Sequence, residues 1–249
     1  MLDRDVFLRP IAHRGYHDKA RGRIENSPAA FRAAVEKGYA IECDLQPSAD
    51  AVPMVFHDFT LERLTAAAGP VAAHPASTLA ALRLAGTDDR IPTLTDLLAL
   101  AAGRVPLVIE IKSAWTPLEP AYLDRIAAEA RAYRGPLALM SFDPAVMAAI
   151  RARAPEIPRG IVAGLYRDEG WWSDVLDAER RERLSHLLES ADAAPAFYSY
   201  HVRDLPTPVT RYVREVQRLP LISWTVRTPD DRALAARWSD APTFEGWEA

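Results

Sequence analysis

The sequence predicts an α/β protein, a TIM (β/α)8 barrel, and three observations support this fold class. The chain has 249 residues, which is close to the length of single-domain barrels of this kind. Short apolar runs of strand length alternate with amphipathic segments of helical length. Eight such runs can be counted, and eight parallel strands close a barrel. We therefore expect a single domain over residues 1–249, with the helices outside the sheet.

The expected strands and helices alternate along the chain. Strands are expected at 9–13, 39–45, 106–111, 136–141, 158–162, 196–200, 220–225 and 241–245, the last with the faintest pattern. Helices are expected at 28–37, 93–102, 119–133, 144–153, 177–189, 208–217 and 230–237. Two helix starts carry a chemical signal, because Ser27-Pro28 and Asp143-Pro144 each place a capping side chain before a proline at the first helical position.

A ninth strand-like run, 53–56, interrupts this order. It follows the strand that ends near Leu45 by only about seven residues, whereas a parallel crossover needs a dozen or more. We therefore expect the run to fold back over the C-terminal mouth of the barrel. It would open a small insertion after the second strand, over about 46–90.

Composition and charge exclude several classes of protein. The net charge is −4, and the densest charge run, 179–189, mixes both signs, so no nucleic-acid partner is expected. The single Cys43 excludes an intrachain disulfide and a multi-cysteine zinc site. The N-terminus is charged and no stretch of about 18 apolar residues occurs. We expect a cytoplasmic protein without stable membrane association, and the oligomeric state stays open.

The first candidate site residues follow the first expected strand. His13 can carry a proton near neutral pH, and Arg14 offers a planar fork that matches phosphate or carboxylate oxygens. Because a histidine and an arginine at a strand end are often ordinary surface groups, these two residues need support from the rest of the chain.

Two pairs of charged residues alternate along later strands. Glu42 and Asp44 stand two residues apart, so both point to one face of their strand, and a metal ion would relieve their repulsion. Oxygen-only ligands favour Mg²⁺, Ca²⁺ or Mn²⁺ over zinc. The alternative is one acid at the strand end and one in solvent. Glu110 and Lys112 repeat the geometry, and could supply a third ligand and a phosphate contact, or form a buried ion pair.

His57 follows the apolar run 53–56, again where a strand-like segment stops. With His13 it makes a pair of histidines, which can protonate a leaving group and accept a proton from a nucleophile. Four polar motifs at the ends of separate strands favour an active site, since such sites in these barrels are assembled from strand ends.

Taken together, these motifs resemble the successive signatures of the glycerophosphodiester phosphodiesterase family, in the family's order and over roughly residues 11–226. The motifs are His13-Arg14-Gly15, Glu25-Asn26-Ser27, Phe31, Glu42-Cys43-Asp44, Pro53-Met54-Val55-Phe56-His57-Asp58, Thr60-Leu61-Glu62-Arg63, Glu110-Ile111-Lys112, Ser141-Phe142 and Trp224-Thr225-Val226.

The resemblance implies a TIM barrel that hydrolyses glycerophosphodiesters, such as glycerophosphocholine or glycerophosphoethanolamine, to glycerol 3-phosphate and an alcohol. It implies one divalent cation, Mg²⁺ or Ca²⁺, with Mn²⁺ as a third candidate. By position it assigns His13 and His57 as the acid–base pair, Glu42, Asp44 and Glu110 as metal ligands, Arg14 and Lys112 as contacts of the phosphate oxygens, and Trp224 as part of the glycerol pocket.

The chain departs from the family at its last strand, which usually ends in a Thr-Asp-x-Pro motif. Here 239–242, Ser-Asp-Ala-Pro, could be that motif, or Phe244-Glu245-Gly246 could replace it on a shifted strand. The register of the last strand therefore stays open.

Two other readings of the function are kept. One is a lysophospholipase D-type phosphodiesterase with the same site, and the other is a phosphoester-binding barrel without catalysis. Among weaker candidates, the loop aromatics Trp115 and Trp171-Trp172 would meet the alcohol group of the substrate or pack on the barrel, and His201 would face the same mouth.

Overall fold

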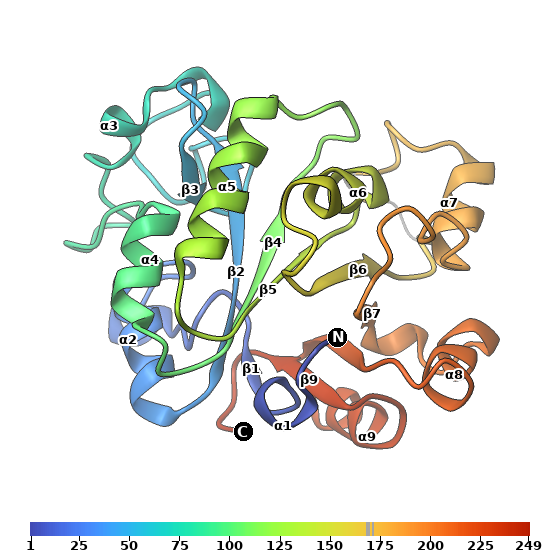
Figure 1. Ribbon diagram of the computed structural model, residues 1–249. Coiled ribbons are helices and arrows are strands. Elements are labelled where there is room, and N and C mark those ends of the chain that lie inside the picture. The colour runs from blue at the N-terminus through green and yellow to red at the C-terminus, as the bar shows by residue number, and fades with distance from the viewer. Residues whose placement is uncertain (168–169, 171) are drawn as a thin grey trace.

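The computed structural model describes residues 1–167, 170 and 172–249, and in them eight parallel strands form a closed barrel (Figure 1). The first strand pairs with both the second and the last, which closes the sheet. The barrel strands are β1 Ile11–Ala12, β2 Ala40–Pro47, β4 Leu107–Ile111, β5 Leu137–Ser141, β6 Arg159–Ala163, β7 Phe197–His201, β8 Leu221–Val226 and β9 Ala241–Phe244. The predicted fold class is thereby confirmed.

The helices lie outside the barrel (Figure 1). They are α1 Arg4–Phe7, α2 Pro28–Lys37, α3 Ala76–Leu79, α4 Leu94–Ala101, α5 Pro120–Ala132, α6 Pro144–Arg153, α7 Ala178–Ser185, α8 Pro208–Glu215 and α9 Pro229–Trp238, with 3-10 turns at 19–21, 71–73 and 202–204. The seven predicted helices are confirmed. Ser27 and Asp143 cap α2 and α6 as expected, since each side chain accepts a backbone N–H from the first turn.

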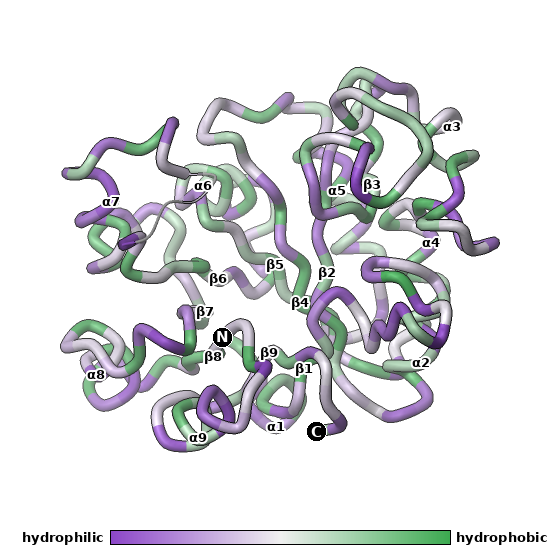
Figure 2. The backbone as a smooth tube through the Cα atoms, turned by 180° about the vertical axis from the view of Figure 1, so that it is seen from behind, coloured by the Kyte–Doolittle hydropathy of each residue, from purple (hydrophilic) through white to green (hydrophobic). Residues whose placement is uncertain are grey.

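Two apolar layers hold the barrel together. On β4, Leu107, Ile109 and Ile111 pack outward with the helices, whereas Val108 packs inside the barrel. This alternation puts Glu110 on the inner face as well. Figure 2 shows hydrophobic and hydrophilic stretches alternating along outer helices such as α2 and α9, which fits helices that bury one face only.

The insertion after β2 folds back, as the short spacing predicted. Its strand β3, Pro53–Val55, pairs antiparallel with the end of β2, where Leu45 stands opposite Val55. Met54, Phe56, Leu61 and their neighbours form a small apolar cluster of their own. The insertion stands beside β2 at one rim of the barrel, and not across the mouth as expected (Figure 1). The antiparallel pairing is the reason, because it ties β3 to the edge of β2.

The position of the last strand decides between the two alternatives for its motif, 239–242 and Phe244-Glu245-Gly246. Ser239 ends α9 and Asp240 precedes β9, so the tetrapeptide 239–242 lies at the start of the strand. Ala12 of β1 pairs with Phe244, which places Glu245 at the C-terminal mouth. Phe244-Glu245-Gly246 therefore lies at the end of β9 next to the site, so of the two alternatives this tripeptide occupies the place of the family motif. Among the described helices, none has the length and apolar character to cross a membrane.

Candidate active site at the mouth of the barrel

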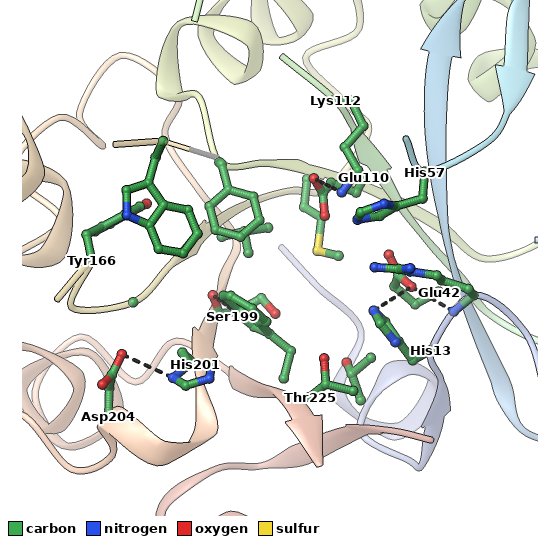
Figure 3. A pocket seen from close by; sticks show the side chains of 18 of the residues that line it. His13, Glu42, His57, Glu110, Lys112, Tyr166, Ser199, His201, Asp204 and Thr225 are labelled. Atoms are coloured by element: carbon green, nitrogen blue, oxygen red, sulfur yellow. Dashed lines mark hydrogen bonds and ion pairs between the residues drawn. The ribbon is translucent and has the colours of Figure 1, made fainter. Parts of the chain in front are cut away.

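The residues predicted from separate strands meet at one cavity of about 550 Å³ at the carboxyl ends of the strands (Figure 3). Seven of the eight predicted residues line it: His13, Arg14, Glu42, His57, Glu110, Lys112 and Trp224. The eighth, Asp44, is buried and joins them through an ion pair of 2.8 Å between its Oδ1 and Lys112 Nζ. No predicted residue is displaced from the site.

Three carboxylates form the centre of the site. Glu42 and Asp44 come from β2, and the register that pairs Asp44 with Glu110 of β4 brings the third acid level with them. All three are buried, and one oxygen of each lies within 4.8 Å of the others. Lys112 Nζ lies 2.8 Å from Asp44 Oδ1 and 2.7 Å from Glu110 Oε1, so the ion pair considered as an alternative is present too.

The charges in this cluster favour a bound cation. Burial, followed by repulsion from Asp44 and Glu110, raises the pKa of Glu42 well above its usual range. Burial also disfavours the charged form of Asp44, yet Lys112, together with His57 and Arg14, holds the pKa of Asp44 below its usual range. Lys112 and Arg14 thus stabilise the charged form of Asp44, whereas the charge of Glu42 is poorly compensated. Three converging oxygen donors are the ligand set that Mg²⁺, Ca²⁺ or Mn²⁺ takes, so these residues fit such an ion.

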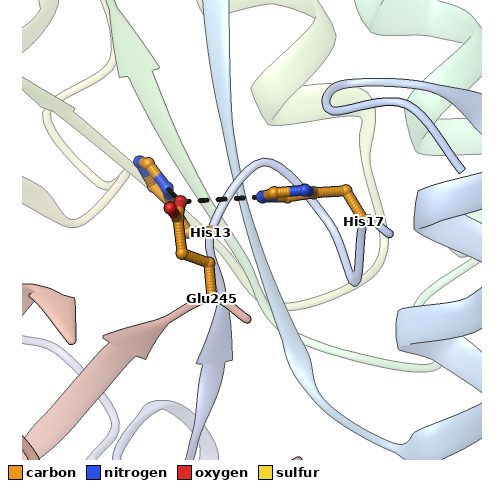
Figure 4. Close-up of side chains that lie close together, drawn as sticks. All are labelled: His13, His17 and Glu245. Carbon is orange, nitrogen blue, oxygen red and sulfur yellow. Dashed lines mark hydrogen bonds and ion pairs between the residues drawn. The ribbon is translucent and has the colours of Figure 1, made fainter. Parts of the chain in front are cut away.

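His13 is oriented by Glu245, a residue without a predicted role. Its Nδ1 donates to Glu245 Oε2 at 2.6 Å (Figure 4). Its Nε2 lies 3.9 Å from Glu42 Oε2. Burial lowers the pKa of His13 to about 4, although Glu245 acts in the opposite direction. Glu245 also accepts from Arg227 and faces His17 Nε2 at 3.6 Å. The available signal was an acid as the last residue of the expected strand 241–245.

His57 comes to the site from the insertion and has a carboxylate partner as well. Its Nδ1 lies 2.7 Å from Asp58 Oδ1. Arg63 donates to Asp58 and to Glu25, and Glu25 in turn accepts from Arg14 at 2.7 Å. This chain of charges links the insertion to β1. Asp58, Arg63 and Glu25 all belong to the motifs quoted above, although sequence reasoning gave them no role.

A separate amide supports the carboxylate cluster. Asn26 Nδ2 donates to Asp44 Oδ2 at 2.8 Å, and the backbone N–H of Arg14 donates to Glu42 Oε2 at 2.9 Å. Both Arg14 and Asn26 take a left-handed backbone conformation, with φ of 52° and 56°. Strained backbone of this kind occurs at sites whose surroundings fix it in place.

The predicted aromatic residues divide between the cavity and the outer surface. Trp224 lines the cavity, where its ring packs edge-on to Phe142 and His201. His201 lines the same cavity, as expected, and so does Trp172. Trp115 lies in a separate surface pocket against Arg180, which agrees with loop packing. The expectation for Trp171 lies outside the described residues.

Comparison with known proteins found one family and a group of similar structures. A family model described as the glycerophosphoryl diester phosphodiesterase family matches residues 13–241. A phosphodiesterase of Oleispira antarctica, solved with the product sn-glycerol-3-phosphate, is 23% identical, with TM-score 0.72 and coverage of 95% of this chain and 92% of that one. The comparison with curated proteins found no match.

Two further structures are similar to the same extent. A glycerophosphodiester phosphodiesterase of Thermotoga maritima is 22% identical, with TM-score 0.70 and coverage of 96% of this chain and 94% of that one. A glycerophosphodiester phosphodiesterase of Agrobacterium tumefaciens is 25% identical, with TM-score 0.68 and coverage of 95% of each chain. These neighbours have the same barrel.

Proposed function

The chain belongs to the glycerophosphoryl diester phosphodiesterase family, and from this premise we propose how it acts and on what. The proposed reaction is the hydrolysis of glycerophosphodiesters, such as glycerophosphocholine or glycerophosphoethanolamine, to glycerol 3-phosphate and an alcohol. It depends on one divalent cation, with Mg²⁺ and Ca²⁺ as first candidates and Mn²⁺ as the third. The observation that carries the proposal is that three buried carboxylates converge at a cavity that is lined by two carboxylate-supported histidines.

Glu42, Asp44 and Glu110 would hold the cation. When bound, it would polarise a phosphoryl oxygen and offset the negative charge that develops during the reaction. Lys112 and Arg14 lie next to the same carboxylates, so their cationic groups can neutralise the other phosphate oxygens. Trp224 would line the pocket for the glycerol part of the substrate.

The two histidines would move the protons. Nδ1 of His13 is occupied by Glu245, and Nδ1 of His57 by Asp58, so each ring presents Nε2 to the substrate. One Nε2 accepts the proton of the nucleophile, and the other donates a proton to the alcohol oxygen as the phosphorus–oxygen bond breaks. The nucleophile is either water, which gives glycerol 3-phosphate directly, or the substrate's own glycerol hydroxyl, which gives a cyclic phosphate that water then opens to glycerol 3-phosphate. The carboxylate partner fixes each tautomer and stabilises the imidazolium that forms.

We propose that the chain acts as one domain over residues 1–249, in the cytoplasm, on a small molecule, without nucleic acid or stable membrane association. A net charge of −4 and a single buried cysteine support this picture.

Release of glycerol 3-phosphate from both diesters, with Mg²⁺, Ca²⁺ or Mn²⁺ and with a chelator, tests the proposal. We expect release that stops on chelation and returns with metal. His13→Ala and His57→Ala should each lower the rate by about 10² or more, because proton transfer contributes 10²–10⁴. His186→Ala, an exposed histidine at the end of α7, is the matched control and should keep its activity.

Absence of release with every metal would contradict the proposed hydrolysis. Lysophospholipids would then be tried on the same site. A second failure would leave a phosphoester-binding barrel, although binding alone does not require two histidines that each have a carboxylate partner.

A further inference from the structure

The Nδ1 atom of His13 faces a second cluster of side chains that can bind a metal ion. Among the described residues, two groups of potential ligands converge: the three carboxylates of the site, and the group His13, His17 and Glu245. Figure 4 shows both imidazole rings directed at the Glu245 carboxylate. His13 lines the cavity, whereas His17 and Glu245 do not, so the second group lies behind His13.

The three donor atoms of this group have a spacing that suits a small metal ion. His13 Nδ1 and His17 Nε2 both face the same oxygen, Glu245 Oε2, at 2.6 and 3.6 Å. One donor atom of each residue lies within 4.8 Å of the others. Bonds of about 2.0–2.1 Å place the ligands of a tetrahedral zinc ion about 3.3 Å apart, and the two measured distances bracket this value. Small rotations of the side chains would therefore complete the coordination.

The types of ligand distinguish this group from the carboxylate cluster. Two imidazole nitrogens and one carboxylate oxygen, with a fourth position left for water, are a common ligand set for Zn²⁺. Imidazole also suits Ni²⁺ and Cu²⁺, whereas sites made only of oxygens suit Mg²⁺ and Ca²⁺. The two groups of ligands should therefore select different ions.

The turn that carries His17 is held firmly in place. The N–H of Gly15 donates to the carbonyl of Glu42 at 3.1 Å, and the N–H of Tyr16 donates to the carbonyl of Ala30 at 3.1 Å. Gly15 has a φ of +79°, which glycine adopts without strain. Because the turn is tied to β2 and α2, His17 faces Glu245 before an ion binds, and this lowers the entropic cost of binding.

An ion can reach these side chains from solution. The side chains of His17 and Glu245 are 23% and 20% exposed. Arg227 binds the other oxygen of Glu245, Oε1, and its own side chain is 52% exposed. Oε2, the oxygen that both histidines face, is therefore left for the ion.

We propose that His13, His17 and Glu245 form a second metal site, which takes an imidazole-preferring ion such as Zn²⁺ and inhibits the enzyme when it is filled. The ion would bond to Nδ1 of His13, and the hydrogen that Nδ1 donates to Glu245 would be carried by Nε2 instead. The ring would then have no lone pair with which to accept a proton, and it could not become the imidazolium that acts as an acid. The inhibition rests on the proposed function, but the binding of the ion does not.

Equilibrium dialysis against Zn²⁺, with the carboxylate cluster saturated by Mg²⁺, tests the binding. We expect the wild type to retain one Zn²⁺ per chain. His17→Ala and His17→Gln should each weaken its affinity by at least about tenfold, because partners outside the coordination sphere already contribute 10–100-fold. The glutamine can still donate to Glu245, so it separates the loss of a ligand from the loss of a polar contact. Glu42→Gln, which alters the other cluster, and His186→Ala should bind Zn²⁺ like the wild type.

The rate of glycerophosphodiester hydrolysis in excess Mg²⁺ tests the inhibition. Each protein is compared with its own rate without zinc, so a change in basal activity does not disturb the result. Zn²⁺ should lower kcat of the wild type, and the two His17 variants should need at least about tenfold more Zn²⁺ for the same fractional loss. Additional Mg²⁺ should not restore the rate.

Unchanged Zn²⁺ affinity in both His17 variants would overturn the site. Loss of zinc binding in Glu42→Gln, or recovery of the rate with additional Mg²⁺, would overturn it too, because either result places the ion on the carboxylates. Zinc that binds through His17 but leaves kcat unchanged would overturn the inhibition. A wild type that hydrolyses no diester would overturn the proposed function, and the dialysis would still decide whether the second metal site exists.

Discussion

The carboxylate of Glu245 is shared by three side chains of the site. It accepts from His13 Nδ1 at 2.6 Å, binds Arg227 and faces His17. Because several side chains contact the Glu245 carboxylate, it has little freedom to rotate. The His13 imidazole that donates to it is therefore fixed in its orientation as well. Carboxylate partners of metal-binding histidines typically contribute 10–100-fold to metal affinity or activity, and we expect the same range for the partner of His13.

We expect Glu245→Gln to lower kcat by about 10–100-fold while KM stays within about twofold, because the amide keeps the shape but loses the charge that stabilises a protonated His13. Steady-state kinetics on a glycerophosphodiester would measure this split. Glu248→Gln is the control, since Glu248 is exposed and pairs with Lys37 outside the cavity. An unchanged kcat would remove Glu245 from the mechanism.

For single residues, the positions of the site residues could be predicted from the sequence, but their hydrogen-bond and ion-pair partners could not. Glu42, Asp44 and Glu110 were found because alternation along a strand and strand-end placement can be read locally. The pairing of His13 with Glu245 joins residues 232 positions apart, and only the closure of the barrel brings them together. The link from Arg14 through Glu25 to Arg63 likewise depends on how the insertion stands against β1.

Local sequence patterns predict most of the strands and helices, but they miss short helices and some helix ends. Helix-capping residues, prolines at helix starts, and the alternation of strand-like apolar runs with amphipathic segments were enough to place the barrel strands and the longer helices. The helices α1 and α3 were missed because four residues are too few to show a helical period. The helix α7 was predicted to run to 189 but ends at Ser185, because Leu187 takes a left-handed φ of 60°.

The contact between β6 and β7 depends on one glycine. A Cβ on Gly160 would lie 2.3 Å from the buried ring of Phe197. We expect Gly160→Ala to lower the free energy of unfolding by about 1–3 kcal/mol, the usual cost of overpacking a core. Denaturant unfolding would measure the change.

A second variant shows whether this clash is the cause. In the Phe197→Leu background the added methyl group has more room, so Gly160→Ala should cost less there, and the two substitutions should not add. Equal costs in both backgrounds would mean that the strain has another origin.

For the molecule as a whole, the carboxylate cluster connects metal binding to stability. An ion that binds only the folded chain stabilises it by about 2.7 kcal/mol at a concentration 100 times its Kd. For a chain of this size, each kcal/mol moves the melting temperature by about 2–4 °C. We therefore expect Mg²⁺ or Ca²⁺ at such concentrations to raise it by roughly 5–11 °C, and a chelator to reverse the rise.

Glu42→Gln should remove most of this metal-dependent shift in a thermal scan, because it takes away one ligand. Glu36→Gln, an exposed residue of α2, should keep the full shift. If the Glu42 variant responded to metal like the wild type, the ion would bind elsewhere.

Closure of the barrel by its first and last strands also has a consequence during synthesis. His13 leaves the ribosome 232 residues before Glu245. At 5–20 residues per second, that interval is roughly 10–50 s. A nascent chain carries both histidines and all three carboxylates well before Glu245 is added, so at that stage His13 lacks the partner that orients it. The finished arrangement arises only when β9 docks on β1, so a strand made later completes the surroundings of a histidine made earlier.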